Sequence, residues 1–189
     1  MIVPRPTAVR RWARLLALAA ALAGCGPTAA QLQALRQRAD AGDADAQVAL
    51  ARSYAAGEGI DPNPAEAASL YRKAAITGHP QAQLALGLAY REGIGVPQDD
   101  QEALRWVRTA AGSGEPRAQA LLGVIYEEGA GVPRDLVAAH AWLNLAAAGL
   151  PPEERERAVR HRDWLAGVMT PAQIAEAQRR AREWAPQRP

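Results

Sequence analysis

The side chains best suited to acid–base or metal chemistry are scattered along this chain of 189 residues. None of the three histidines, His79, His140 and His161, stands one helical turn from another histidine or from a cysteine, as metal ligands on one helix do. Glu127 and Glu128 are adjacent, so on a helix they point in different directions and are solvated charges rather than a general acid–base pair. We therefore expect no catalytic residue, no metal, no cofactor and no small-molecule substrate.

The single cysteine, Cys25, follows a segment built like a secretory signal. Residues 1–14 carry four arginines and no acid, and residues 15–23 are only Leu and Ala, too few to span a bilayer core of about 30 Å. Leu22-Ala23-Gly24-Cys25 then looks like a bacterial lipobox. We expect a lipoprotein signal peptide over 1–24 and a lipid on Cys25. The alternative is a secreted protein with one incidental thiol, which is unusual in an oxidising compartment.

Charge and tether length bear on location. The chain has 22 basic and 20 acidic residues, but without Arg5, Arg10, Arg11 and Arg14 the numbers are 18 and 20, which argues against a nucleic-acid partner.

Gly26 rather than Asp follows Cys25, which by the sorting habit of Gram-negative lipoproteins implies the outer membrane. The tether over 25–30 reaches at most about 3.5 Å per residue. We expect a membrane partner through the lipid, with the body close to the periplasmic face of the outer membrane.

The rest of the chain is organised by a period of 36 residues. Four sets of residues recur in register: Tyr54, Tyr90 and Tyr126; Gly57, Gly93 and Gly129; Gly59, Gly95 and Gly131; Ala67, Ala103 and Ala139. A period of this size indicates stacked units that cannot bury their apolar faces alone. Alanine-rich apolar stretches and the absence of Phe favour closely packed helices over a sheet. We predict an all-α solenoid of antiparallel helix pairs, with a half repeat over 31–44 and repeats over 45–80, 81–116 and 117–149.

Each predicted repeat has two helices joined by a glycine-containing hinge. In the second repeat the hinge runs from Gly93 to Asp99, where paired glycines supply positive φ and the aspartate can cap the next helix. Gly87 and Gly123 fall within first helices, where they favour close approach of the paired helix. Trp106 and Trp142 recur in register on the second helices and are predicted core residues.

The period breaks after Gly149. A helix from Pro151-Pro152 to about Ala166 and a second one from Thr170-Pro171 to about Trp184 are predicted. Over 150–185 these two charged helices are expected to form the polar cap that a solenoid needs for solubility. The tail over 186–189 is expected to be frayed.

Together these motifs identify a family resemblance. Ala-x-x-x-Leu-Gly-x-x-Tyr, Gly-x-Gly-Val, Asp, Ala-x-x-Trp and Ala-Ala-x-x-Gly, all present over 82–114, resemble the Sel1-like repeat, a relative of the tetratricopeptide repeat. The resemblance covers roughly 31–149, and the first repeat departs from it at Ala51, Asp61 and Leu70. It implies a right-handed superhelix whose concave surface binds a protein or an extended peptide, and a role as adaptor rather than enzyme.

By the geometry of tetratricopeptide-like repeats, the resemblance also assigns a partner-binding groove to first-helix positions outside the buried motif. These are Asp45, Val48, Arg52, Ala55, Gln81, Leu84, Leu88, Glu92, Arg117, Ala120, Val124 and Glu127. The mixture of small or apolar residues with charges of both signs suits an extended segment rather than a strongly charged ligand. The alternative for any one position is a solvated face residue.

Two classes of function remain open from the sequence. One is a lipid-anchored adaptor that scaffolds or regulates an envelope complex. The other is a peptidoglycan-binding or cell-wall-associated protein. Some Sel1-like proteins resemble penicillin-binding hydrolases, but those carry paired cysteines in every repeat, whereas this chain has only Cys25. We therefore expect no enzyme.

Overall fold

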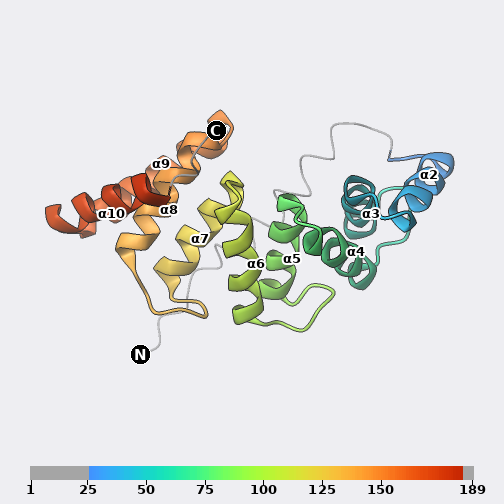
Figure 1. Ribbon diagram of the computed structural model, residues 1–189, viewed down its shortest axis with the longest axis horizontal. Helices are drawn as coiled ribbons and strands as arrows, with labels where there is room; N and C mark the ends of the chain where they lie inside the picture. The colour runs from blue at the N-terminus through green and yellow to red at the C-terminus, as the bar shows by residue number, and fades with distance from the viewer. Residues whose placement is uncertain (1–25, 185–189) are drawn as a thin grey trace, which may run out of the picture.

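The computed structural model describes residues 26–184, and every element in that range is a helix (Figure 1). Helical hairpins follow one another along the long axis of the molecule in chain order, as the colours in Figure 1 show. The all-α solenoid is therefore confirmed. The signal peptide expected over 1–24, Cys25 and the tail over 186–189 lie outside the described residues. The helices are α2 (Ala29–Asp40), α3 (Ala44–Ala56), α4 (Pro64–Ile76), α5 (Pro80–Glu92), α6 (Asp100–Gly112), α7 (Pro116–Glu128), α8 (Leu136–Gly149), α9 (Pro152–Val168) and α10 (Pro171–Trp184).

Three complete repeats pair a first helix with a second helix: α3 with α4, α5 with α6, and α7 with α8. Helix α2 is the second helix of the half repeat and packs against α3. Each first helix begins one residue before the boundary expected from the sequence. The helical part of the half repeat also begins early, at Ala29, where the Thr28 hydroxyl and the Gln31 side chain form a reciprocal N-terminal cap. Only Gly26, Pro27 and Thr28 separate Cys25 from this helix.

The hinges hold neighbouring repeats together as well as turning the chain. The first glycine of each hinge ends the first helix in the left-handed conformation. The second glycine lies against the preceding second helix: a Cβ built on Gly95, whose φ is +74°, would come within 2.0 Å of the Pro64 carbonyl oxygen. Both φ and space therefore require glycine here. Asp99 and Asp135 cap the following helices, as expected.

Close approach within a repeat depends on the two mid-helix glycines. A Cβ on Gly87 would lie 2.7 Å from Cγ2 of Val107, and one on Gly123 would lie 2.9 Å from Cγ of Leu143. No larger side chain fits without moving the partner helix, which confirms the packing role predicted for both glycines. Trp106 and Trp142 are half-buried against this core.

Three buried glutamines join each first helix to the second helix before it. The side-chain Nε2 atoms of Gln47, Gln83 and Gln119 donate to carbonyl oxygens 3.1–3.2 Å away, on Ala39, Ala75 and Ala111. These carbonyls lie in the last turn of a helix, and each also accepts the backbone N–H of the glycine three residues on, so the glutamine supplies a second donor. The glutamines recur every 36 residues, and the sequence interpretation overlooked them.

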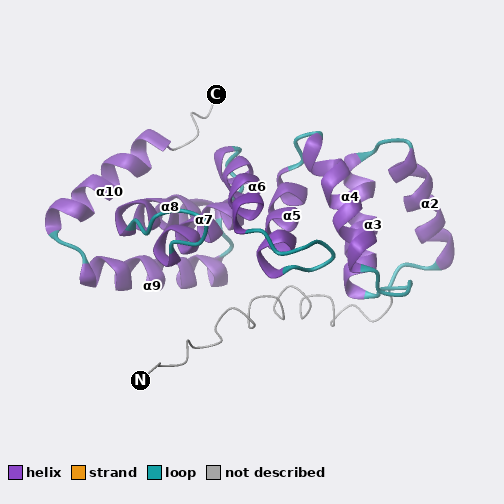
Figure 2. Ribbon diagram, turned by 90° about the horizontal axis from the view of Figure 1, so that it is seen from below, coloured by secondary structure: helices purple, strands orange, loops and turns teal. Residues whose placement is uncertain are grey.

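At the C-terminal end, α8 packs against both α9 and α10 (Figure 2). Trp184 of α10 stacks on Trp142 of α8 with ring centroids 5.0 Å apart. Ala177 and Ala181 of α10 are buried in the same cluster. Thr170 caps α10, as expected, through its hydroxyl and the backbone N–H of Gln173.

The sequence period breaks after Gly149, as expected, but the packing pattern continues into α9. Arg162 stands 36 residues after Tyr126, and its guanidinium donates to Asn144, which stands 36 residues after Arg108. The equivalent bond one repeat earlier joins Arg108 to Tyr126. Helix α9 thus occupies the place of a first helix although its residue types have changed. Leu165 falls where a hinge glycine would stand, so the helix continues to Val168.

Candidate functional site

The first helices α3, α5, α7 and α9 form one row along the stack, because polar side chains join each to the next. The bonds run from Arg91 to Glu128 at 2.6 Å and from Arg117 to Glu154 at 2.7 Å. Others join Arg52 to Gln81 at 2.8 Å, Asp45 to His79 at 3.1 Å and Glu127 to His161 at 2.6 Å. The row is therefore continuous from the first repeat to α9.

Five of the predicted groove residues take part in these bonds: Asp45, Arg52, Gln81, Arg117 and Glu127. The bond to Arg117 lowers the pKa of the Glu154 carboxyl, and the same bond raises the pKa of Arg117. Partial burial raises the pKa of Glu92, against the opposing charge of Arg91. All polar members of the predicted groove except Glu92, which is half-buried, therefore fix the spacing of the helices.

Apolar and small members of the predicted groove lie between these bonds. Leu84, Leu88, Ala120 and Val124 are half-buried, and Ala55 is exposed. Partly exposed apolar side chains held on fixed helices are surfaces against which another chain can bury area.

Val48 does not belong to an accessible surface, contrary to the expectation. Its side chain is 4% exposed and lies in a core cluster with Ala74, Ala75, Ala82 and Leu86. The end of α4 and the start of α5 cover this position of α3. Val48 is therefore a core residue that joins two repeats.

The residues considered for acid–base chemistry have structural partners except His140, whose buried Nδ1 has none. Glu127 and Glu128 bond to different units, to His161 and to Arg91, so they are not the free solvated charges that we expected. His79 is the N-terminal cap of α5. Among residues 26–184 no group of three or more His, Cys, Asp or Glu side chains could hold a metal ion.

Comparison with known proteins decides the family. A family model of the Sel1 repeat matches residues 44–79, 80–115 and 116–149, which are the three helix pairs described above. The chain belongs to the Sel1 repeat family. Sel1 repeat proteins generally mediate protein–protein interactions, and the fold is typically a non-catalytic scaffold.

Two solved structures resemble this Sel1 repeat chain. A Sel1 repeat protein from Oxalobacter formigenes is 39% identical with a TM-score of 0.59, over 62% of this chain and 49% of that one. A protective antigen present in uropathogenic Escherichia coli strains, displaying an SLR fold, is 28% identical with a TM-score of 0.62, over 94% of this chain and 45% of that one. This chain thus spans about half the length of each. A comparison with curated protein sequences finds no match.

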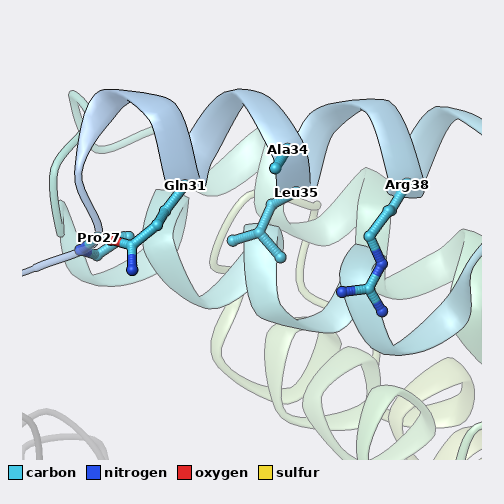
Figure 3. A pocket seen from close by; sticks show the side chains of 5 residues that line it. All are labelled: Pro27, Gln31, Ala34, Leu35 and Arg38. Carbon is cyan, nitrogen blue, oxygen red and sulfur yellow. The ribbon is translucent and has the colours of Figure 1, made fainter.

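A shallow hollow of about 470 Å³ lies on the half repeat, along one side of α2 (Figure 3). It is lined by Pro27, Gln31, Ala34, Leu35 and Arg38. The later Sel1 repeats bury alanine at the positions of Gln31 and Arg38, 36 residues on, at Ala67 and Ala74. Long polar side chains at those positions prevent close helix packing, so this face is the polar end of the stack.

No helix within residues 26–184 combines the length and the apolar character needed to cross a bilayer.

Proposed function

We propose that this Sel1 repeat protein is a lipid-anchored scaffold that binds an extended segment of a protein partner along its row of first helices. The observation that carries the proposal is the continuity of this row. Inter-repeat bonds fix four helices side by side, and half-buried apolar side chains such as Leu84, Leu88 and Val124 lie between the bonds.

Fixed spacing favours binding because less conformational freedom is lost when the partner docks. The row repeats with each unit, so a partner in extended conformation meets equivalent side chains at regular intervals. The five bonded polar residues have part of their hydrogen-bonding capacity occupied within the protein, so the apolar positions supply the main free contacts.

The anchor belongs to the same proposal. The lipobox-like sequence at Cys25, the sole cysteine, supports lipidation, and Gly26 after it supports sorting to the outer membrane. In the structure Gly26 packs on the first hinge, where a Cβ on Gly26 would lie 3.2 Å from the backbone nitrogen of Gly59. A lipid on Cys25 would therefore hold the first repeat close to the bilayer, in the periplasm, as part of an envelope complex.

A photo-crosslinking amino acid at Leu88 tests the binding surface, with one at the exposed Ala172 of α10 as the control outside both proposed docking surfaces. We expect the Leu88 probe to give protein adducts in intact cells that the Ala172 probe does not give. Equal adducts from both positions would contradict a specific surface. Adducts to peptidoglycan stem peptides instead of protein would support the cell-wall alternative.

Replacing Cys25 with Ser tests the anchor. We expect the variant to move from the membrane fraction to the soluble periplasm, because the sulfur that carries the lipid is gone. Retention of the variant in the membrane fraction would show that lipid on Cys25 does not hold the protein.

A further inference from the structure

Three arginines stand at equivalent places on α2, α4 and α6, and each contacts a tyrosine on the next helix. Nη2 of Arg36, Arg72 and Arg108 lies 3.5, 2.6 and 2.9 Å from the hydroxyl oxygens of Tyr54, Tyr90 and Tyr126. The guanidinium carbon of Arg72 is also 5.8 Å from the centroid of the Tyr90 ring, and that of Arg108 is 5.6 Å from the centroid of Tyr126. The tyrosines therefore hold the guanidinium groups in place.

These three arginines are exposed and form no salt bridge within residues 26–184. Other exposed arginines of the same chain are neutralised, for example Arg105 by Glu102 and Arg160 by Glu156. The series of arginines ends after Arg108, because Asn144 stands at the next equivalent place, and Arg162, which replaces the tyrosine there, forms a salt bridge to Asp163. Within residues 26–184 other exposed cations such as Arg52 and Lys73 also form no salt bridge, but only these three arginines recur at one position of successive repeats, each against a tyrosine.

Each arginine–tyrosine pair has the hydrogen-bond donors needed to bind a carboxylate. A guanidinium presents several N–H donors in a planar fork, and one bond to a phenol oxygen leaves the others available. The tyrosine hydroxyl accepts that bond and keeps its own proton to donate. Ile76, one turn after Arg72 on α4, is 72% exposed and offers an apolar contact beside the fork.

The ladder faces away from the predicted groove. Tyr90 is two residues after Leu88 on α5, which places the two side chains about 200° apart around the helix axis. The arginines stand on second helices, which contribute no residue to the groove.

We propose that the ladder formed by Arg36, Arg72 and Arg108 with their tyrosines is a second docking surface, which binds an extended acidic segment of a protein with one carboxylate per repeat. Neighbouring helix axes lie roughly 8–10 Å apart, so equivalent groups of successive repeats are separated by roughly 10–20 Å. An extended chain covers that distance in about three to six residues. Three cations are few for a nucleic-acid backbone, which favours the peptide.

This surface shares one premise with the proposed function, that the partner is a protein, but it is a separate site. The test uses the purified full-length chain and fluorescence anisotropy of a labelled Gly-Ser peptide of about 16 residues with Asp at every fourth position. We expect the triple variant R36Q, R72Q and R108Q to bind at least about tenfold more weakly. The matched control R105Q, R160Q and R179Q changes net charge equally at arginines that already pair with glutamates, and should bind as the unmodified chain does.

Equal weakening in the control variant would overturn the proposal, because net charge alone would then explain binding. Equal affinity for a peptide with Asn in place of Asp would also overturn it, as would tighter binding of a single-stranded oligonucleotide. If circular dichroism shows that the triple variant does not fold, the proposal is tested instead by comparing the affinities of the Asp and Asn peptides for the unmodified chain and for the Tyr90→Phe variant. The Leu88 crosslink should persist in the triple variant, so failure of the ladder leaves the first-helix row standing.

Discussion

His140 stands 36 residues after Leu104 and 72 after Ala68, at a place that the other repeats fill with buried apolar side chains. It is 4% exposed, and its Nδ1 atom is buried without a hydrogen-bond partner. Burial lowers the pKa of His140, the charge of Arg162 lowers that pKa further, and Asp163 opposes the shift. The fold therefore favours the neutral imidazole.

A lowered pKa in the folded state makes stability depend on pH with a defined sign. The unfolded chain takes up a proton near pH 6.5 that folded His140 resists, so stability is complete above that pH and falls as the solution becomes more acidic. We expect His140→Leu to raise the free energy of unfolding at pH 7 by about 1 kcal/mol, since a buried unpaired polar atom is removed. Urea unfolding at pH 7 and pH 5 should also show a smaller loss of stability in the variant. An unchanged loss between these pH values would contradict this account.

Gly95 and Gly112 provide a matched pair of glycine-to-alanine substitutions. Gly95→Ala places a residue with a side chain at φ +74° and drives its Cβ to 2.0 Å from the Pro64 carbonyl oxygen, so we expect a loss of roughly 2–4 kcal/mol. Gly112 ends α6 with open space around it, and its replacement by alanine should stabilise by up to about 1 kcal/mol. Thermal unfolding of both variants measures the difference. Similar melting temperatures would show that the hinge contact between repeats is not required.

The sequence correctly predicted the roles of residues that depend only on their neighbours along the chain. Asp99 caps a helix and Gly93 ends one because of the backbone beside them, and both roles follow from neighbouring residues. Val48 could not be assigned correctly, because its burial depends on which face α4 and α5 cover. The ladder of arginines and tyrosines was likewise missed, since only the tyrosines belong to a recognised motif.

At the scale of elements, the junction between repeats depends on the buried glutamines. Gln83 is 4% exposed, and its Nε2 donates to the carbonyl of Ala75 near the end of α4. We expect Gln83→Ala to destabilise by about 1–2 kcal/mol, because the bond across the junction is lost and a cavity forms, while Ala75 keeps the N–H of Gly78 and the unpaired Oε1 of Gln83 is removed. Chemical denaturation of this variant should be compared with that of Gln33→Ala, an exposed position on α2 that should change stability by less than about 0.5 kcal/mol. Equal losses of stability in the two variants would show that the glutamine does not stabilise the junction between repeats.

Helix α9 shows why element boundaries were predicted better than element placement. Its start after Pro151 follows from proline at the first helical positions. Its role as a further first helix is invisible in residue types, because Arg162 replaces the tyrosine and Leu165 replaces the hinge glycine. The return of α10 onto α8 depends on the contact of Trp184 with Trp142, which no local pattern indicates.

At the scale of the whole molecule, each repeat is stabilised mainly by its contacts with the adjacent repeats. Each helix of the three repeats packs chiefly against the helices before and after it in the chain. With one cysteine, no disulfide within the chain can join distant repeats. The repeats then unfold cooperatively only if the junctions between them are stabilising enough that unfolding of one repeat also unfolds the repeat packed against it.

Leu86→Ala tests this transmission. Leu86 is fully buried in the cluster that joins α3, α4 and α5, and its truncation should cost about 2–5 kcal/mol. Trp106 packs against this cluster, so it is replaced with Phe in the background chain. The other three tryptophans within residues 26–184 lie on α8, α9 and α10, C-terminal to this site, whereas far-ultraviolet circular dichroism reports every helix. If the junctions are strong, both signals shift to the same lower denaturant midpoint. If fluorescence keeps its original midpoint while circular dichroism splits into two steps, the N-terminal repeats unfold alone, and the row of first helices does not act as one rigid surface.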